Sequence, residues 1–352
     1  SLFKQGRYSG FIKPISYVAD LAIINVFAFF WFFEDIYSFG FLVQSFFTGL
    51  GTTLANFTPA ILVSFGILAL TDKMDNGIPV STYWAFAIGA AASIITILIT
   101  VLTTSEYPPN PEELNAIENS KKGENLIVKI IMDIGVAIKE MPLAMKQLIP
   151  VMFFPWYAMF CYWQYLTSAL SLSLYGTLDQ STSYFNQAQL LTGNLNGTYN
   201  IICFTIAFAM IPIAKWLGAQ KLHFISLVIG GIGLLSMPFL NDVDVLFTIP
   251  FGSGIEVSQI YLFSFGLGIT WASMMAMPYQ ILASSIPNGK TGIYMGIFNI
   301  FIVVPMIIQI FSVQYFVYDL LGQNPINIIR LAGSFLIIGG IFSLFVSQPK
   351  TD

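Results

Sequence analysis

Long runs of apolar residues alternate with short polar segments along almost the whole chain. A helix needs about 20 consecutive apolar residues to cross the hydrocarbon core of a bilayer, and on that basis the pattern predicts about nine spans. They cover residues 16–33, 40–68, 83–104, 147–170, 199–217, 222–240, 256–283, 292–318 and 328–347. The expected fold class is therefore an all-α membrane protein, a polytopic helix bundle of about nine spans.

The composition agrees with a lipid environment. Of the 352 residues, 56% are hydrophobic and only 9% are charged, whereas a soluble domain carries about 25% charged residues. So few charges cannot coat a water-soluble surface, so we expect the lipid bilayer as a partner and no nucleic acid. Cys161 and Cys203 both fall in apolar runs. We interpret them as small buried residues rather than a disulfide or a metal pair, and we expect no cofactor.

One long polar segment, residues 105–146, interrupts the apolar runs. Its first half is rich in proline and acidic residues, which is typical of a solvated linker. Isoleucines at helical spacing follow at Ile127, Ile130, Ile131, Ile134 and Ile138. They favour an amphipathic helix on the membrane surface over an irregular loop. Residues 175–198 and 240–254 are predicted to be polar loops.

The placement of lysine orients the predicted spans. Putting the 105–146 linker, the 215–221 turn, the 284–291 connector and the C-terminal tail on one side collects most of the lysines there. By the positive-inside rule that side is cytoplasmic. The span at 16–33 does not fit, because its basic start would then lie outside. Either it does not cross fully, or region 34–45 departs from the predicted pattern, or the first thirty-odd residues come from a different ancestral fold.

Two neighbouring apolar helices, joined by a polar connector, make up residues 271–311. They carry Tyr279, Asn299 and Gln309. Amide side chains are costly against lipid but useful against a watery path, which suggests a transporter. The predicted span at 147–170 is rich in aromatic residues, and sugar sites combine flat apolar faces with fixed hydrogen-bonding groups. The candidate sugar-binding residues are Gln44, Asn56, Trp156, Tyr162, Gln164, Trp271, Tyr279, Asn299 and Gln309.

The same amides have an alternative role as hydrogen-bonding groups between helices, each worth about 0.6 kcal/mol. The only histidine, His223, stands near the end of a predicted span. We interpret it as an interfacial residue rather than a proton relay.

Several segments resemble a known family. The aromatic helix, the turn PIAKWLGAQKLH and the stretch MPYQILASSIPNGKTGIYMGIFNIFIVVPMIIQ resemble the sugar transporters of the major facilitator superfamily. More narrowly, they are similar to the sucrose and maltose proton symporters related to the glycoside-pentoside-hexuronide transporters. GFLVQSFFTGLGTTLANFTP and TTSEYPP resemble that family's fifth and sixth helices. The resemblance covers residues 38–350 and implies two six-helix halves with the sugar between them.

The family's first four helices have no counterpart, so we expect a major facilitator fold lacking its first helices, in a truncated or rearranged transporter. The expected division is an N-terminal membrane segment of uncertain origin (1–37), a partial N-terminal half (38–104), a cytoplasmic linker (105–146) and a six-helix C-terminal half (147–352). The resemblance implies a monomer in the bacterial inner membrane that carries a sugar such as maltose or sucrose, coupled to a proton or sodium. No arginine stands in mid-membrane after Arg7, so we expect weak proton coupling.

Residues 1–33 suggest a different class of protein. GRYSGFIKPISYVADLAIIN resembles the N-terminal anchor of the bacterial polyprenyl-phosphate sugar phosphotransferases. Such an enzyme needs a polar catalytic domain after its anchor, and residues 105–146 are the only long polar stretch. We therefore expect a transporter without enzymatic activity. A fragment of such a phosphotransferase and a non-transporting membrane protein remain the alternatives.

Overall fold

The computed structural model describes residues 36–69, 72–74, 79–103, 126–249, 255–286 and 291–347, with a few positions between 105 and 115. The predicted span at 16–33 and the polar connector 287–290 lie outside the described residues. The chain forms two compact units. Unit 1 comprises Ser1–Gln44 and Thr82–Asp133, and unit 2 comprises Ser45–Ser81 and Ile134–Asp352.

Four described helical segments are long and apolar enough to cross a membrane: Val80–Thr103, Ala219–Phe239, Gly292–Leu320 and Pro325–Ser343. In unit 1, helix α4 (Val80–Thr103) has none of its most apolar stretch buried by protein. Its threonines donate to carbonyl groups of their own helix, as Thr96 Oγ1 does to Ala92 O at 2.9 Å. The threonine hydroxyls therefore need no partner in lipid. The chain is a helical membrane protein.

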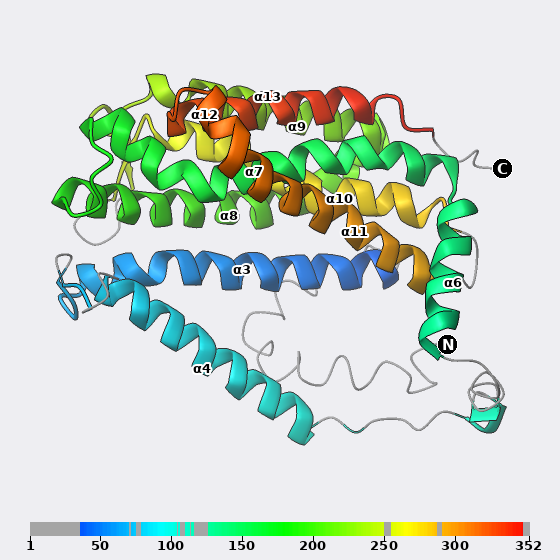
Figure 1. Cartoon of the computed structure of the whole chain (residues 1–352). Helices are drawn as coiled ribbons and strands as arrows, with labels where there is room; N and C mark the ends of the chain where they lie inside the picture. Colours follow the sequence, from blue (N-terminus) through cyan, green and yellow to red (C-terminus); the bar gives the residue numbers. More distant parts are fainter. Residues whose placement is uncertain are drawn as a thin grey trace. The chain divides into compact units, whose positions relative to one another are not determined.

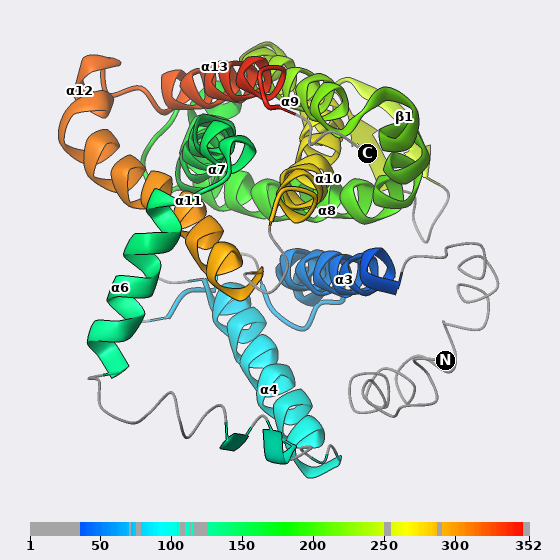
Figure 2. The ribbon, with the colours of Figure 1, turned by 90° about the vertical axis from the view of Figure 1, so that its right-hand side faces the viewer.

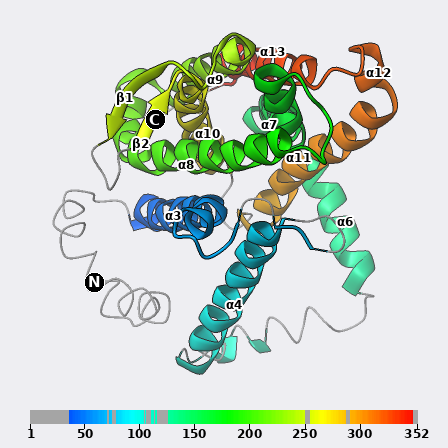
Figure 3. The same ribbon diagram turned by 90° about the vertical axis from the view of Figure 1, so that its left-hand side faces the viewer.

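Five helices of unit 2 pack into a bundle (Figure 1). They are α7 (Leu143–Tyr175), α8 (Ser183–Leu217), α9 (Ala219–Ser236), α10 (Tyr261–Ala283) and α13 (Pro325–Ser343). Helix α13 packs on α7 and α9, α10 packs on α9 and α8, and α8 returns to α7. The views along the helices show α7 and α10 between α8 on one side and α9 and α13 on the other (Figures 2 and 3). The five helices therefore enclose a common interior.

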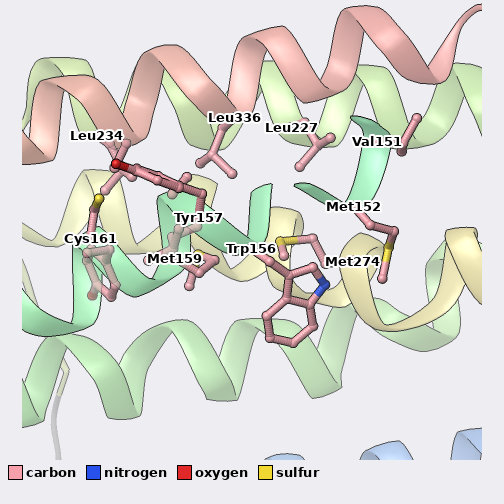
Figure 4. Close-up of a cluster of buried hydrophobic side chains, with 14 of the residues drawn as sticks. Val151, Met152, Trp156, Tyr157, Met159, Cys161, Leu227, Leu234, Met274 and Leu336 are labelled. Atoms are coloured by element: carbon pink, nitrogen blue, oxygen red, sulfur yellow. The ribbon is translucent and has the colours of Figure 1, made fainter. Parts of the chain in front are cut away.

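Buried apolar side chains fill that interior. Figure 4 shows part of this core, in which Val151, Met152 and Trp156 of α7 lie among side chains of α9, α10 and α13, including Leu227, Met274 and Leu336. Both cysteines, Cys161 and Cys203, are buried and free, which confirms their predicted role as small buried residues.

Two further helices join unit 2. Helix α11 (Thr291–Ser312) packs on α7 and continues through the π-helical turn Val313–Val317 into α12 (Tyr318–Leu320). The C-terminal part of α3 (Ile36–Ser64) meets α8, where Thr52 Oγ1 donates to Asn200 Oδ1 at 2.9 Å. A Cβ on Gly193 would lie only 3.0 Å from Asn56 O, so the two backbones approach closely there.

Two predicted loops are wrong. Residues 175–198 mostly belong to α8, which begins at Ser183 after Thr182 caps it by accepting from Phe185 N at 3.2 Å. Two of their polar side chains, Thr192 and Asn196, form hydrogen bonds with Thr167 and Tyr162 of α7. The 240–254 segment contains strand β1 (Val245–Ile249), which pairs antiparallel with β2 (Ile255–Ser258). Their β-branched residues favour strands, so the span predicted from residue 256 starts at Tyr261 instead.

The other predictions for the described elements agree with the structure in kind. The amphipathic helix is present as α6 (Leu126–Lys139), so the alternative of an irregular loop is wrong there. Its position on a membrane surface stays a prediction. The runs at 40–68, 83–104, 147–170, 222–240 and 328–347 all correspond to helices, each displaced by a few residues. Such shifts between an apolar run and its helix are typical. The end of an apolar run depends on where polar residues begin, whereas the end of a helix depends on how its terminal backbone groups are capped.

Candidate functional site

An aromatic cluster occupies the contact of α7, α8 and α10. Its centre is the half-buried Trp271, whose ring stands edge-on to Trp163 at 5.5 Å, to Trp156 at 5.6 Å and to Tyr199 at 6.5 Å between centroids. Tyr162 joins through Tyr199 at 6.1 Å. Edge-to-face pairs of this kind stabilise a defined arrangement by about 0.5–1.5 kcal/mol each beyond their burial.

Gly268 brings α8 and α10 close enough to build this cluster. A Cβ at this position would lie 2.6 Å from Ile202 Cβ and 2.7 Å from Tyr199 O, so only glycine fits the approach. Gly268 and Trp271 are three residues apart on α10 and therefore share one face of the helix. The close approach thus explains why Trp271 reaches the Tyr199 ring.

Hydrogen bonds order the polar edge of the aromatic cluster. Trp163 Nε1 donates to Tyr199 OH at 3.2 Å, and the buried Tyr162 OH donates to Asn196 Oδ1 at 2.8 Å. Asn200 Nδ2 donates to Asn196 O at 2.8 Å. These amides and hydroxyls stand beside large apolar ring faces, which is the combination that sugar recognition requires.

One donor in the aromatic cluster has no protein partner. Trp156 is only 7% exposed, yet its Nε1 has no acceptor within the described part of the chain. A buried indole N–H ordinarily finds an acceptor, because leaving it unsatisfied costs about 1–3 kcal/mol. Trp156 Nε1 is therefore a buried donor that no acceptor in the described residues satisfies.

A second polar group joins α7 and α11. Gln309, which is fully buried, donates through Nε2 to Gln164 Oε1 at 3.1 Å and approaches Cys161 Sγ at 3.6 Å. Its Oε1 has no donor among the described residues. One turn further along α11, Ser312 Oγ lies 2.8 Å from Tyr157 OH. The π-helical turn begins at the next residue, and such turns often occur at functional sites.

The structure thus brings some predicted residues together and separates others. Trp156, Tyr162 and Trp271 meet in the aromatic cluster, and Gln164 pairs with Gln309. Tyr279 packs on Phe298 at 5.1 Å instead. The Asn56 amide donates to Thr52 O of its own helix at 2.7 Å, and Asn299 is exposed. The side chain of Gln44 lies outside the described residues.

Sequence reasoning missed two sets of residues. Asn196, Tyr199 and Asn200 stand at positions i, i+3 and i+4, a helical pattern hidden by the prediction of a loop. His223 is the other, because it is buried with 1% of the residue exposed, and its position at the membrane interface stays a prediction. Its Nδ1 lies 2.8 Å from Ser273 Oγ of α10, also buried. Nothing in the sequence distinguishes a buried histidine from one at the membrane interface near a helix end.

Metal binding is not indicated in the described part of the chain, where no three His, Cys, Asp or Glu side chains gather as ligands. Searches against protein-family models and curated proteins find no significant match to this chain.

Proposed function

We propose that this protein is a secondary transporter that binds a sugar at the aromatic cluster of α7, α8 and α10 and releases it across the membrane by alternating access. The observation that carries the proposal is the buried Trp156 Nε1, a donor without a partner in the described residues, beside the ring of Trp271. A sugar hydroxyl would accept from this N–H while the C–H face of the ring covers apolar carbon.

The proposal includes the finer architecture expected from the resemblance. Nine spans would form a major facilitator fold in which residues 38–104 are part of the N-terminal half and residues 147–352 are the C-terminal half. A disaccharide such as maltose or sucrose is the proposed substrate, and the bacterial inner membrane is the proposed location. The helical bundle of unit 2, with apolar helices such as α9 and α13 and hydrogen-bonded polar side chains at some helix contacts, supports this proposal.

Ligand-dependent stability provides the first test. A sugar that binds only the folded protein raises its apparent stability, by about 2.7 kcal/mol at a concentration 100 times the Kd. We expect maltose or sucrose to raise the melting temperature of the purified chain in detergent, and sorbitol at the same concentration to have a smaller effect. Equal shifts with all three solutes would indicate a solvent effect and contradict the proposal.

The variant Trp156→Phe tests the site itself. It keeps an aromatic ring and removes the N–H, so we expect sugar affinity to fall about tenfold, the equivalent of one lost hydrogen bond of about 1.4 kcal/mol. Trp216→Phe is the matched control, because Trp216 on α8 is 84% exposed. Calorimetric titration of both variants with maltose measures the difference. Equal affinities would place the sugar elsewhere.

A further inference from the structure

The α9 and α10 contact holds a buried titratable side chain that the proposed sugar site does not use. His223 of α9 lies with its Nδ1 2.8 Å from Ser273 Oγ of α10. Its Nε2 is buried and has no partner among the residues that the structure describes. An imidazole is the side chain best suited to exchange a proton near neutral pH.

The surroundings of His223 offer no negative charge. The helices that pack on α9 are α8, α10 and α13, and none of them contains Asp or Glu. Their charged residues, with those of α9, are the exposed Lys215, Lys221 and Arg330, and the other titratable groups include Cys203, Tyr199, Tyr261 and Tyr279. A protonated imidazole here would be a buried cation without a counter-charge.

Proton uptake would also change the hydrogen bonding. With both ring nitrogens protonated, Nδ1 donates to Ser273 Oγ and Nε2 becomes a charged donor with no acceptor in the described structure. The protonated form would therefore favour an arrangement of α9 and α10 in which water reaches Nε2. The unprotonated form favours the arrangement observed here.

The His223 contact is joined to the aromatic cluster through α10. Ser273 stands two residues after Trp271, and Leu222, next to His223, belongs to a small apolar cluster with Ala272 against which Trp271 packs. Close packing of Gly230 against Thr270 fixes the two helices about two turns along α9 from His223. Beyond that fixed point Pro278 interrupts the hydrogen bonds of α10. A shift at Ser273 would move the Trp271 ring.

We propose that His223 binds the proton that drives transport, and that its protonation favours an arrangement of α9 and α10 in which water reaches Nε2 and Trp271 is displaced. This inference rests on the transport function proposed above. It replaces the expectation of weak proton coupling, which was based on the absence of a charged residue in mid-membrane.

Transport in proteoliposomes tests the coupling. We expect wild-type protein to exchange labelled for unlabelled maltose, and to accumulate maltose up to about tenfold under a gradient of one pH unit if one proton accompanies each sugar. In His223→Asn, the amide can bind Ser273 but cannot take up a proton. This variant should keep exchange and lose accumulation. Ser226→Ala is the control, because the Ser226 hydroxyl, also buried on α9, binds only Leu222 O of its own helix.

The outcomes separate the two proposals. Accumulation by His223→Asn at the wild-type level overturns the role of His223, as does loss of exchange together with accumulation at an unchanged melting temperature. Absence of exchange in the wild type overturns the sugar-transport proposal instead.

A measurement without sugar tests the role of His223 even if the wild type does not exchange maltose. His223 is the only histidine of the chain, so nitrogen-15 labelling of histidine gives a single imidazole to follow by nuclear magnetic resonance. We expect its protonation to accelerate amide hydrogen exchange in α9 and α10 about tenfold. An imidazole that titrates without any change in exchange, or that stays neutral until the chain unfolds, overturns the inference.

Discussion

The aromatic cluster and the contacts of α9 with α10 and α13 show two different ways to join membrane helices. In the latter, the part here called the glycine seam lies away from His223, where Gly230, Gly231, Gly266 and Gly333 let backbones touch. A Cβ on Gly231 would lie 2.7 Å from Gly333 O, and a Cβ on Gly333 would lie 2.7 Å from Gly231 O. In the aromatic cluster large rings and hydrogen bonds make most of the contact, although Gly268 lets α10 approach α8 closely there too.

This difference indicates which contact can rearrange. Backbone atoms in contact have no alternative rotamers, so the glycine seam has one arrangement. A substitution that disturbs it therefore lowers the stability of the bundle. Rings and amides have alternative rotamers and hydrogen-bond partners, and one donor of the aromatic cluster has none at all in the described residues. The glycine seam therefore suits a fixed support, and the aromatic cluster suits a surface that adapts to a ligand.

The largest expected effect breaks the glycine seam. Gly231→Ala places a methyl group 2.6 Å from Ile337 Cγ1 and 2.7 Å from Gly333 O, and we expect a loss of about 1–3 kcal/mol in the free energy of unfolding. Unfolding by denaturing detergent measures it. Gly296→Ala is the control, because nothing lies within 4 Å of its Cβ, and alanine there should be neutral or stabilising. Equal stabilities of Gly231→Ala and Gly296→Ala would show that the packing at the glycine seam can adjust to an added methyl group.

Tyr162→Phe tests the aromatic cluster and has a smaller expected effect. It removes the donor to Asn196 Oδ1 at 2.8 Å without changing the ring. Such bonds in membrane proteins average about 0.6 kcal/mol and reach about 1.7 kcal/mol. We expect a loss in that range, together with weaker maltose binding. Tyr315→Phe, at a position 60% exposed, is the control. A loss of stability with unchanged maltose affinity would make the Tyr162 hydroxyl a structural group only.

The sequence predicts some parts of the aromatic cluster and the glycine seam and misses others. Apolar length alone identifies α4, α9 and α13 as helices, because lipid accepts no other backbone arrangement. The aromatic residues of α7 and the tryptophan of α10 mark the aromatic cluster. The first half of α8 could not be recognised as a helix, because it is rich in polar residues such as Asn196 and Asn200, which is typical of a loop. The hydrogen-bond partners of these two side chains come from other helices.

The glycine seam and His223 could not be predicted in detail for a related reason. A run such as IGGIG on α9 signals close packing but not against which helix, since partners are set by the bundle as a whole. His223 is polar by composition and buried by its position between α9 and α10. Whether a polar side chain faces water, lipid or a neighbouring helix depends on contacts that one helix does not encode.

The smallest expected effect concerns the turn between α7 and α8, the two helices that contribute most rings to the aromatic cluster. Ser181 donates to Asp179 Oδ1 through its hydroxyl at 2.7 Å and its N–H at 2.9 Å, which holds the pKa of the exposed Asp179 carboxyl below its usual value. The carboxylate therefore stabilises the turn above the unfolded pKa of about 3.9, and this contribution is lost as the pH falls through the lower folded value.

Hydrogen exchange of the amides in residues 181–186 should therefore accelerate as the pH falls below about 4, relative to the intrinsic rate. The change should be absent in Asp179→Asn, whose side-chain oxygen still accepts from Ser181 but does not titrate. Amides of α13 around Gly333 should show no matching change, because α13 contains no group that titrates near pH 4. Acceleration in both regions would mean that acid opens the whole bundle, and that the aromatic cluster and the glycine seam do not differ in the way proposed here.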